Sequence, residues 1–335
     1  MDNLKKLLVS QLITAPIVAA VIWIISAGGK YFFLYLWLFL FIVVFLMMTI
    51  YPEFIAPLFD KYTPLPSSEL KDKIEALATR VEYPLKKLYV VQGSKRSAHS
   101  NAYMYGFWKN KRIVLYDTLL SEELNQKLKT IGEEEENLKK KKNADNEKAE
   151  KYTTIDESNK KENDEHSTSK PVIEEKDDEE GHKRLGVTDD EVVAVLGHEL
   201  GHWKLWHTVI NLVIMELNTL LLLSVFAYFY RQESLYRAFG FTEQPIIIGI
   251  MLVLQFVTAP YNELISLAMS FISRHAEFAA DRFSAELGYA RLLSSALVKL
   301  GKDNLSLPID DWLYSAVNHS HPPSPERIAA LKKYM

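Results

Sequence analysis

The sequence predicts a mainly α-helical protein with several membrane-spanning helices and a small β-sheet edge. Four stretches of the 335 residues are apolar over about 20 residues or more, the length that a helix needs to cross a bilayer. Only two or three short runs have the β-branched and aromatic character of strands. The mean hydropathy of the chain is near zero, because four apolar stretches and one strongly charged stretch offset each other. The net charge of -4 therefore says little about partners. The lipid bilayer is therefore the first partner that the sequence predicts.

Residues 1–51 are expected to form a transmembrane helical hairpin. Residues 7–27 are mostly apolar, and residues 31–50 are dense in Phe, Leu, Trp and Val. A secretory signal would have a shorter apolar part that ends in a small-residue cleavage site. The segment of residues 28–30 leads directly into the second run instead, which favours two spanning helices.

Residues 52–131 are expected to be a cytosolic region with a small sheet that binds substrate. Residues 51–61 are rich in proline and aromatic side chains, as a segment at the membrane interface is. Residues 67–81 have helical apolar spacing, and residues 88–91 and 111–116 have the composition of short strands. The edge of such a sheet can pair with an extended peptide.

Residues 132–186 form a charged insertion, for which disorder is expected. The segment alternates acidic, basic and small polar residues and has almost no apolar side chain to bury. Its lysine block at residues 139–142 is offset by neighbouring acids and has no aromatic platform beside it. These features argue against nucleic acid as a partner.

Residues 187–207 carry the pattern His-Glu-x-x-His on an apolar helix whose first turn, residues 188–191, is a capping box. His198 and His202 share one helix face, so both imidazoles can bind one metal ion. Glu199 is placed to reach a water on that metal as a general base. The competing interpretation is an amphipathic helix with two half-buried histidines.

A third metal ligand is expected in the last region, residues 274–335. A catalytic zinc takes three protein ligands, and because the chain has no cysteine they must be His or carboxylate. Glu277 and Asp281 are four residues apart on a predicted helix. Glu277 as the ligand, with Asp281 orienting a ligand imidazole, fits the known design of zinc sites. His275 is the competing third ligand.

Two more spanning helices are expected in residues 208–273, the second of them broken at Pro260. The catalytic helix is expected to continue through His207 into the first of them. Glu216 and Glu263 lie within these spans, and ionisable groups at membrane depth usually face a cavity or a partner. They suggest an aqueous chamber, and the alternative is that both lie near an interface and extend to water.

Four spans place both termini, the small sheet and the motif helix on one side of the membrane. The lysine-rich flanks make that side cytosolic. Lys332 and Lys333 near the C-terminus resemble a dilysine retrieval address, which predicts the endoplasmic reticulum membrane. A cationic last helical turn has the same appearance.

A proline-stiffened turn at residues 318–327 carries His321 and Arg327. Beside a zinc site, these side chains can stabilise the oxyanion that forms when water attacks a peptide carbonyl. The alternative is a proline-rich helix entry with histidines that face solvent.

Five collinear segments carry a resemblance that spans nearly the whole chain apart from the charged insertion. They resemble the type I CAAX prenyl endopeptidases, integral membrane zinc proteases that process prenylated proteins such as yeast a-factor and prelamin A. Members remove the C-terminal tripeptide after an isoprenylated cysteine, so the resemblance implies prenylated C-terminal peptides as substrates. The segments are residues 51–61, 93–106, 195–203, 277–281 and 320–327.

The resemblance also implies roles for individual residues. His198, His202 and Glu277 would bind one zinc ion per chain, and Glu199 would activate the water. The remaining roles are support of a ligand by Asp281, contact on the substrate side by His321 and Arg327, and binding of the substrate backbone as an added strand by Asn101 and Ala102.

The chain departs from this family in one respect. Members have seven spanning helices around a large intramembrane chamber, whereas this chain is expected to begin at the fourth and to lack the first three.

Three rival functions remain at this stage. One is a related membrane protease that degrades misfolded membrane proteins. Another is a catalytically silent membrane adaptor, against which the complete set of His198, Glu199, His202 and Glu277 argues. A transporter that uses Glu216 and Glu263 ranks last, because the sequence has no inverted repeat.

Overall fold

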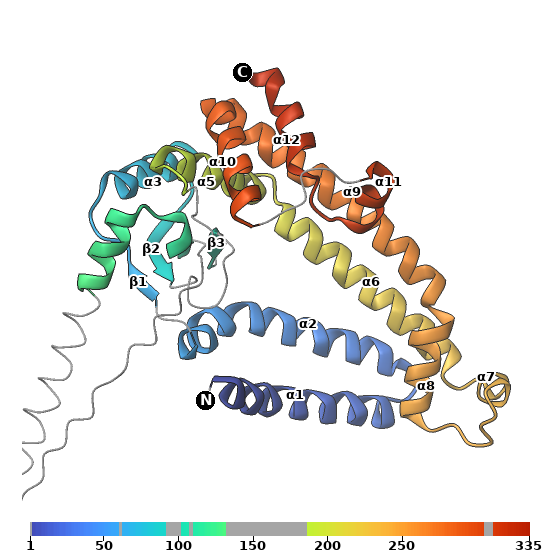
Figure 1. The fold of residues 1–335 in the computed structure, drawn as a ribbon. Helices are drawn as coiled ribbons and strands as arrows, with labels where there is room; N and C mark the ends of the chain where they lie inside the picture. Colours follow the sequence, from blue (N-terminus) through green and yellow to red (C-terminus); the bar gives the residue numbers. More distant parts are fainter. Residues whose placement is uncertain (1, 60–61, 92–101, 107–109, 132–185, 305–310) are drawn as a thin grey trace, which may run out of the picture.

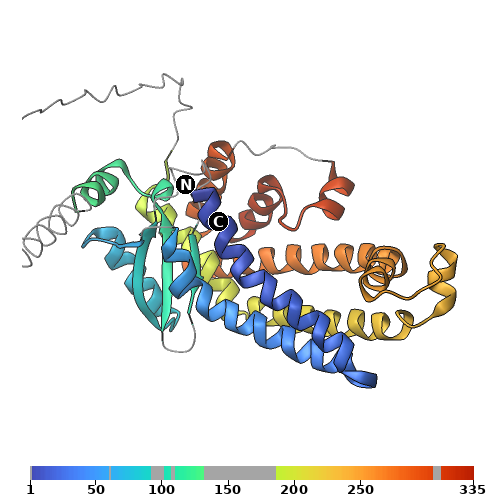
Figure 2. The same ribbon diagram turned by 90° about the horizontal axis from the view of Figure 1, so that it is seen from below.

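The computed structural model describes residues 2–59, 62–91, 102–106, 110–131, 186–304 and 311–335. Long helices dominate it, and a small sheet lies at one end (Figure 1). Both termini lie at the same end as the sheet, and the short helix α7 (Glu233–Ala238) lies at the opposite end in both views (Figures 1 and 2). The predicted disordered insertion at residues 132–186 falls almost entirely outside the described residues.

The N-terminal helices α1 (Asp2–Ala27) and α2 (Phe32–Ile50) form the predicted hairpin and lie side by side in both views (Figures 1 and 2). The turn between them requires glycine at Gly28, where a Cβ atom would lie 2.5 Å from the carbonyl oxygen of Ile24. Phe32 then packs in a buried cluster between α2 and the later membrane helices. The turn therefore sets how closely the two helices approach.

Three described helices are long and apolar enough to cross a membrane, and a bent pair raises the number to four. The third is α6 (His207–Phe229). The bent pair consists of α8 (Ile246–Leu252) with its continuation to residue 257, followed by α9 (Ala259–Ser284), at an angle of 58°. Pro260 lies in the first turn of α9, where a missing amide proton costs nothing. The helices match the predicted four spans if the bent pair is one span, and the bend lies between residues 257 and 259, just before Pro260.

The sheet has four strands in the order β1-β2-β4-β3, one more than the largest predicted number. β2 (Leu85–Val91) and β4 (Lys111–Tyr116) are parallel and form its centre. β1 (Tyr62–Pro64) and β3 (Ala102–Tyr105) are antiparallel edge strands of three and four residues, too short to give a periodic signal.

The helix α3 (Glu69–Arg80) covers the sheet, with the predicted cap from Ser68. Its apolar face buries Leu70 and Ile74 against the strands and against α5 (Asp189–Lys204), which carries the His-Glu-x-x-His pattern. One continuous apolar core therefore joins the sheet to the motif helix.

The helix α5 does not continue into the third span as predicted. It ends at Lys204, and Trp206 takes a left-handed backbone conformation with φ of 61°, after which α6 begins. Such a conformation costs a non-glycine residue roughly 1 kcal/mol or more, so the packing on either side must hold it. The turn directs α6 away from the sheet and brings His207 back toward α5.

Close packing of α5 against α9 positions the site. The face of α5 that packs on α9 carries Gly197 and Gly201. A Cβ atom at Gly201 would lie 3.1 Å from the Cα atom of Ala280. At the same seam the Ser284 hydroxyl donates a 2.9 Å hydrogen bond to the Ala194 carbonyl oxygen. The two helices therefore approach backbone to backbone.

The remaining C-terminal helices pack around this pair. They are α10 (Ala290–Asp303), α11 (Trp312–Asn318) and α12 (Ser324–Leu331). Both α11 and α12 lie along α9 (Figure 1).

The capping box of α5 is present and is tied to α10. Glu191 accepts hydrogen bonds from the Thr188 amide at 2.7 Å, the Ser295 hydroxyl at 2.6 Å and the Lys299 ammonium at 2.7 Å. Burial opposes ionisation of Glu191, but these hydrogen bonds outweigh it, and its pKa lies below the ordinary 4.5. The charged form is therefore favoured by the fold.

We expect Glu191→Gln to destabilise the protein by about 2 kcal/mol at neutral pH, because it leaves the partly buried Lys299 ammonium without a charged partner. Since the pKa of Glu191 is lowered by folding, its contribution is present above about pH 4.5 and is lost as the pH falls below that value. Thermal unfolding of both proteins across pH 4–8 should show the difference shrink at the acidic end. Glu233→Gln, at an exposed pair with Arg237, is the matched control and should change stability by less than about 0.5 kcal/mol.

Candidate metal centre

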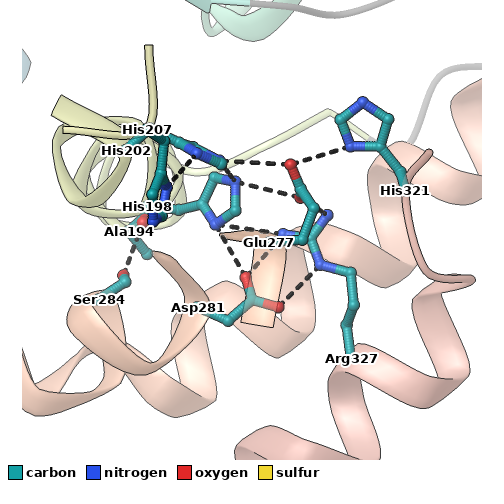
Figure 3. Close-up of polar contacts among 9 residues, drawn as sticks. All are labelled: Ala194, His198, His202, His207, Glu277, Asp281, Ser284, His321 and Arg327. Carbon is teal, nitrogen blue, oxygen red and sulfur yellow. Dashed lines mark hydrogen bonds and ion pairs between the residues drawn. The ribbon is translucent and has the colours of Figure 1, made fainter. Parts of the chain in front are cut away.

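The helix α5 places the two histidines of the motif on one face, one turn apart (Figure 3). The Nε2 atoms of His198 and His202 lie 3.2 Å apart. His198 is buried, and His202 is partly exposed. This arrangement follows from the four-residue spacing on a regular, well-capped helix.

The helix α9 supplies the third donor. Glu277 is 3% exposed, and its two carboxylate oxygens lie 3.3 Å from the Nε2 atom of His202 and 3.5 Å from that of His198. One donor atom from each of the three side chains lies within 4.8 Å of the others. In the described part of the chain, this is the group of His and carboxylate side chains that meets the geometry of a metal site.

The spacing of these donors fits a tetrahedral ion. Metal–ligand distances of about 2.0–2.1 Å in zinc sites place neighbouring ligand atoms about 3.3–3.4 Å apart. The Nε2 atoms of the two histidines lie 3.2 Å apart, and each lies 3.3 or 3.5 Å from a different carboxylate oxygen of Glu277. The buried Oε2 atom of Glu277 also has no hydrogen-bond partner, although the Arg327 Nη1 atom lies at ion-pair distance, 3.2 Å. Two imidazoles and a carboxylate are the donor set expected for a catalytic zinc.

The outer face of His198 is held by a carboxylate. Its Nδ1 atom lies 2.9 Å from the Oδ1 atom of Asp281, which is one helical turn after Glu277 and 2% exposed. Arg327 from α12 in turn donates to both oxygens of Asp281, at 2.8 Å from Nε and 2.6 Å from Nη2 (Figure 3). The contacts from Arg327 through Asp281 to His198 fix the orientation of the imidazole and direct its Nε2 atom toward the other donors.

The outer face of His202 is held by another histidine, which sequence reasoning did not assign to the site. The Nδ1 atom of His207 lies 2.9 Å from the Nδ1 atom of His202. The left-handed turn at Trp206 produces this contact, and no pattern in the sequence announces that turn. This contact links the imidazole of His202 to that of His207 at the start of α6.

His321 approaches the group from the side opposite to α5. Its Nδ1 atom lies 3.0 Å from the Oε1 atom of Glu277, while much of the ring is exposed. The hydrogen bond with the Glu277 carboxylate raises the pKa of His321 above its ordinary value. His321 is therefore the polar side chain at the open side of the site.

Glu199 lies next to the two histidines on α5 and lines the same cavity as they do, about 440 Å³ in volume. Burial raises the pKa of Glu199, and the nearby His198 and His202 oppose that rise. A carboxylate whose pKa is raised toward neutrality is suited to accept and return a proton.

The sheet reaches the cavity through β3. Ala102 is buried on this edge strand and lines the cavity, whereas Asn101 lies outside the described residues. A backbone that enters along β3 would thus arrive beside Glu199.

Other predicted residues lie elsewhere. His275 is exposed on α9 and is not part of the metal-binding group. Glu216 is buried between α6 and α2, where its backbone carbonyl oxygen accepts a 3.1 Å hydrogen bond from Trp37, and Glu263 is exposed. Neither glutamate is among the described residues that line the cavity, and the predicted aqueous chamber stays a prediction.

Comparison with known proteins agrees with this geometry. The family model described as peptidase family M48 matches residues 64–335, which include every residue of the metal-binding group. The chain belongs to peptidase family M48. A second family model, described as the CAAX prenyl protease N-terminal region with five membrane helices, matches residues 1–61.

Curated relatives in this family are named CAAX prenyl protease 1 homolog. The chain is 54% identical to the one from Caenorhabditis elegans, with 99% of the chain and 67% of that protein covered. It is 46% identical to the one from Homo sapiens, with 99% and 64% covered. The fold also resembles the crystal structure of S. mikatae Ste24p, with a TM-score of 0.74, 36% identity, and 98% of this chain and 65% of that chain covered.

The chain therefore spans about two thirds of the length of the relatives that it matches. The prediction that it lacks the family's first three membrane helices is not borne out, because the N-terminal family model matches residues 1–61. The match to this membrane region and the apolar helices together show a multi-pass membrane protein.

Membership of the M48 family also identifies the metal. The donors His198, His202 and Glu277 are grouped closely enough to bind one ion, and in this family of metalloproteases that ion is zinc. The predicted cofactor is thus confirmed.

Proposed function

We propose that the protein is a zinc endopeptidase of the membrane that removes the C-terminal tripeptide from isoprenylated CAAX proteins. The observation that carries the proposal is the convergence of His198, His202 and Glu277 beside a cavity that also contains Glu199. The relatives' printed names supply the substrate class. Zinc bound by the three donors would polarise the scissile carbonyl group and the attacking water.

Glu199 is the general base in this proposal. Its carboxylate lies in the cavity next to the metal ligands, accepts a proton from the attacking water, and returns it to the leaving amine. Burial raises the proton affinity of this carboxylate, which supports its acceptance of the proton from the water.

Three further side chains support the reaction in this proposal. Asp281 orients His198, and the double hydrogen bond from Arg327 keeps Asp281 in place. His321, on the open side of Glu277, donates to the oxyanion that develops when the peptide carbonyl is attacked. Arg327 also lines the cavity, so its positive charge adds to this stabilisation.

The substrate backbone is proposed to bind along β3 as an added strand. Ala102 lies on this edge strand at the cavity, and the family resemblance assigns Asn101 to the same contact. We further propose that the enzyme resides in the endoplasmic reticulum membrane, with the site and both described ends of the chain toward the cytosol. The sheet, the motif helix α5 and both ends lie toward one end of the long helices (Figure 1), which supports a common side for them, and the lysine-rich flanks favour the cytosolic side.

The test is a comparison of two peptides that end in the same Cys-a-a-X sequence, one farnesylated and one without lipid. Each prenyl methylene that is buried contributes about 0.8 kcal/mol, so burial of a few should favour the farnesylated peptide at least about tenfold in kcat/KM. Tripeptide release by the purified chain in liposomes, measured by mass spectrometry, gives both rates. Equal cleavage of the two peptides would favour a broader membrane-protein protease, and no cleavage of either would favour a binding role without catalysis.

A further inference from the structure

An arginine outside the metal-binding group connects three of the C-terminal helices. Arg274 on α9 donates from Nη2 to the Oε2 atom of Glu326 on α12 at 2.7 Å. From Nη1 it donates to the Ser315 hydroxyl on α11 at 3.1 Å. The Arg274 side chain is 12% exposed, and Ser315 is fully buried. The contact with Ser315 is therefore internal, whereas the Glu326 side chain, 41% exposed, makes the ion pair a partly exposed one.

The two helices that Arg274 joins flank the segment that carries His321. Helix α11 ends at Asn318, α12 begins at Ser324, and His321 lies between them. Its contact with the Glu277 carboxylate is made from a bend in the segment that links the two helices. The position of His321 thus depends on how both flanking helices are held.

Arg274 is also fixed relative to the metal ligand. It precedes Glu277 by three residues on α9, so the two side chains leave neighbouring positions of one helix face. One guanidinium group therefore attaches both ends of the His321 segment to the helix that carries Glu277. Any displacement of this attachment changes the distance between His321 and Glu277.

A second attachment holds α12 independently. Arg327, the residue after Glu326, binds Asp281 two turns further along α9. Loss of Arg274 leaves this contact and the metal-binding group in place but removes the Ser315 contact of α11. The exposed hydrogen bond from the Ser270 hydroxyl to the Val317 carbonyl oxygen, at 3.3 Å, still joins α11 to α9. The expected effect is selective for His321.

We propose that Arg274 is the positioning residue for His321, acting through Ser315 and Glu326. The proposal rests on the proposed function, because the role of His321 at the oxyanion is part of it. The geometry explains why arginine is suited to this position, since its planar group can donate to two acceptors on different helices at once. Lysine provides one compact charge and cannot reproduce both contacts.

The primary experiment measures kcat, KM and zinc content of Arg274→Met on the farnesylated peptide. We expect kcat to fall about 10-fold to 100-fold, because a misplacement of about 1 Å at a reacting group has an effect of this size. KM should change less than about threefold, and zinc should remain at one ion per chain. Arg274→Lys should recover part of kcat, and Glu326→Gln should reproduce part of the loss.

The matched control is Arg282→Met, the same substitution on the same helix. Arg282 forms an exposed pair with Glu286 at 4.0 Å, and we expect its loss to change kcat less than about twofold. Loss of zinc from Arg274→Met, or an equal effect of both substitutions, would overturn the proposal.

A double-mutant cycle with His321→Ala separates positioning from a general structural effect. If Arg274 acts through His321, then Arg274→Met should lower kcat no further in the His321→Ala background. If the two effects multiply, Arg274 does not act through His321 and the proposal is wrong.

A measurement without substrate keeps this inference distinct from the proposed function. Amide hydrogen exchange of residues 312–319 should become at least about tenfold faster in Arg274→Met than in the parent or in Arg282→Met. Unchanged exchange would overturn the positioning role even if cleavage is lost. Failure of the parent protein to cleave the farnesylated peptide would overturn the proposed function, while the exchange result would still decide whether Arg274 holds the segment.

Discussion

Replacing Glu199 by glutamine is expected to lower the rate of peptide cleavage about 10³-fold while zinc remains bound at one ion per chain. Glutamine has nearly the same size and keeps the polar contact in the cavity, but it cannot accept a proton. General-base catalysis by a positioned side chain contributes about 10²-fold to 10⁴-fold, and no second carboxylate among the described residues that line the cavity is free of metal-ligand duty. Single-turnover kinetics on the farnesylated peptide, with zinc measured in the same sample, give the two quantities.

The control for this substitution is Glu286→Gln, at an exposed surface pair with Arg282. It should leave cleavage within about twofold of the parent. A Glu199→Gln protein that keeps more than a tenth of the parent rate would show that another group accepts the proton. Loss of zinc from this variant would instead show that Glu199 holds the metal.

Replacing Glu277 by alanine is expected to remove zinc and, with it, all measurable cleavage. The change deletes one of three protein donors and leaves His198 and His202 alone, with Arg327 facing the space that the carboxylate occupied. Outer partners of zinc ligands typically affect metal affinity 10-fold to 100-fold, so loss of a direct ligand should exceed that range. Metal content after dialysis against a weak chelator measures the effect.

His275→Ala is the matched comparison on the same helix, two residues away and exposed. It should retain full zinc content and a melting temperature close to that of the parent, whereas Glu277→Ala should lose the stabilisation that bound metal provides. The reverse result, with zinc lost from His275→Ala and kept in Glu277→Ala, would contradict the assignment of the third donor.

The parts of the site that could be predicted from the sequence are those that depend on local geometry. His198 and His202 share a face because they are four residues apart, and the same spacing aligns Glu277 with Asp281. Length and apolar composition likewise sufficed for the spanning helices, because a bilayer imposes both. The individual catalytic and binding roles remain predictions, since geometry brings the residues together but does not measure what each does.

The parts that could not be predicted depend on tertiary packing. A non-glycine residue in a left-handed conformation, Trp206, ends α5 and brings His207 to His202, although neither glycine nor proline marks the position. The short edge strands β1 and β3 form because the outer edges of β2 and β4 offer backbone hydrogen-bonding groups to them. Three or four residues would not favour a strand on their own. The division into domains proposed from composition also remains a prediction.

The glycine seam between α5 and α9 has a consequence for how the protein acquires its metal. Gly197 and Gly201 each precede a ligand histidine. A Cβ atom at Gly201 would lie 3.1 Å from the Cα atom of Ala280, and one at Gly197 would lie 2.9 Å from the Ser284 hydroxyl oxygen. Packing at these two glycines therefore helps to set the distance from His198 and His202 to Glu277. We expect a methyl group added at Gly201 to push the two helices apart and to weaken metal uptake without altering any ligand.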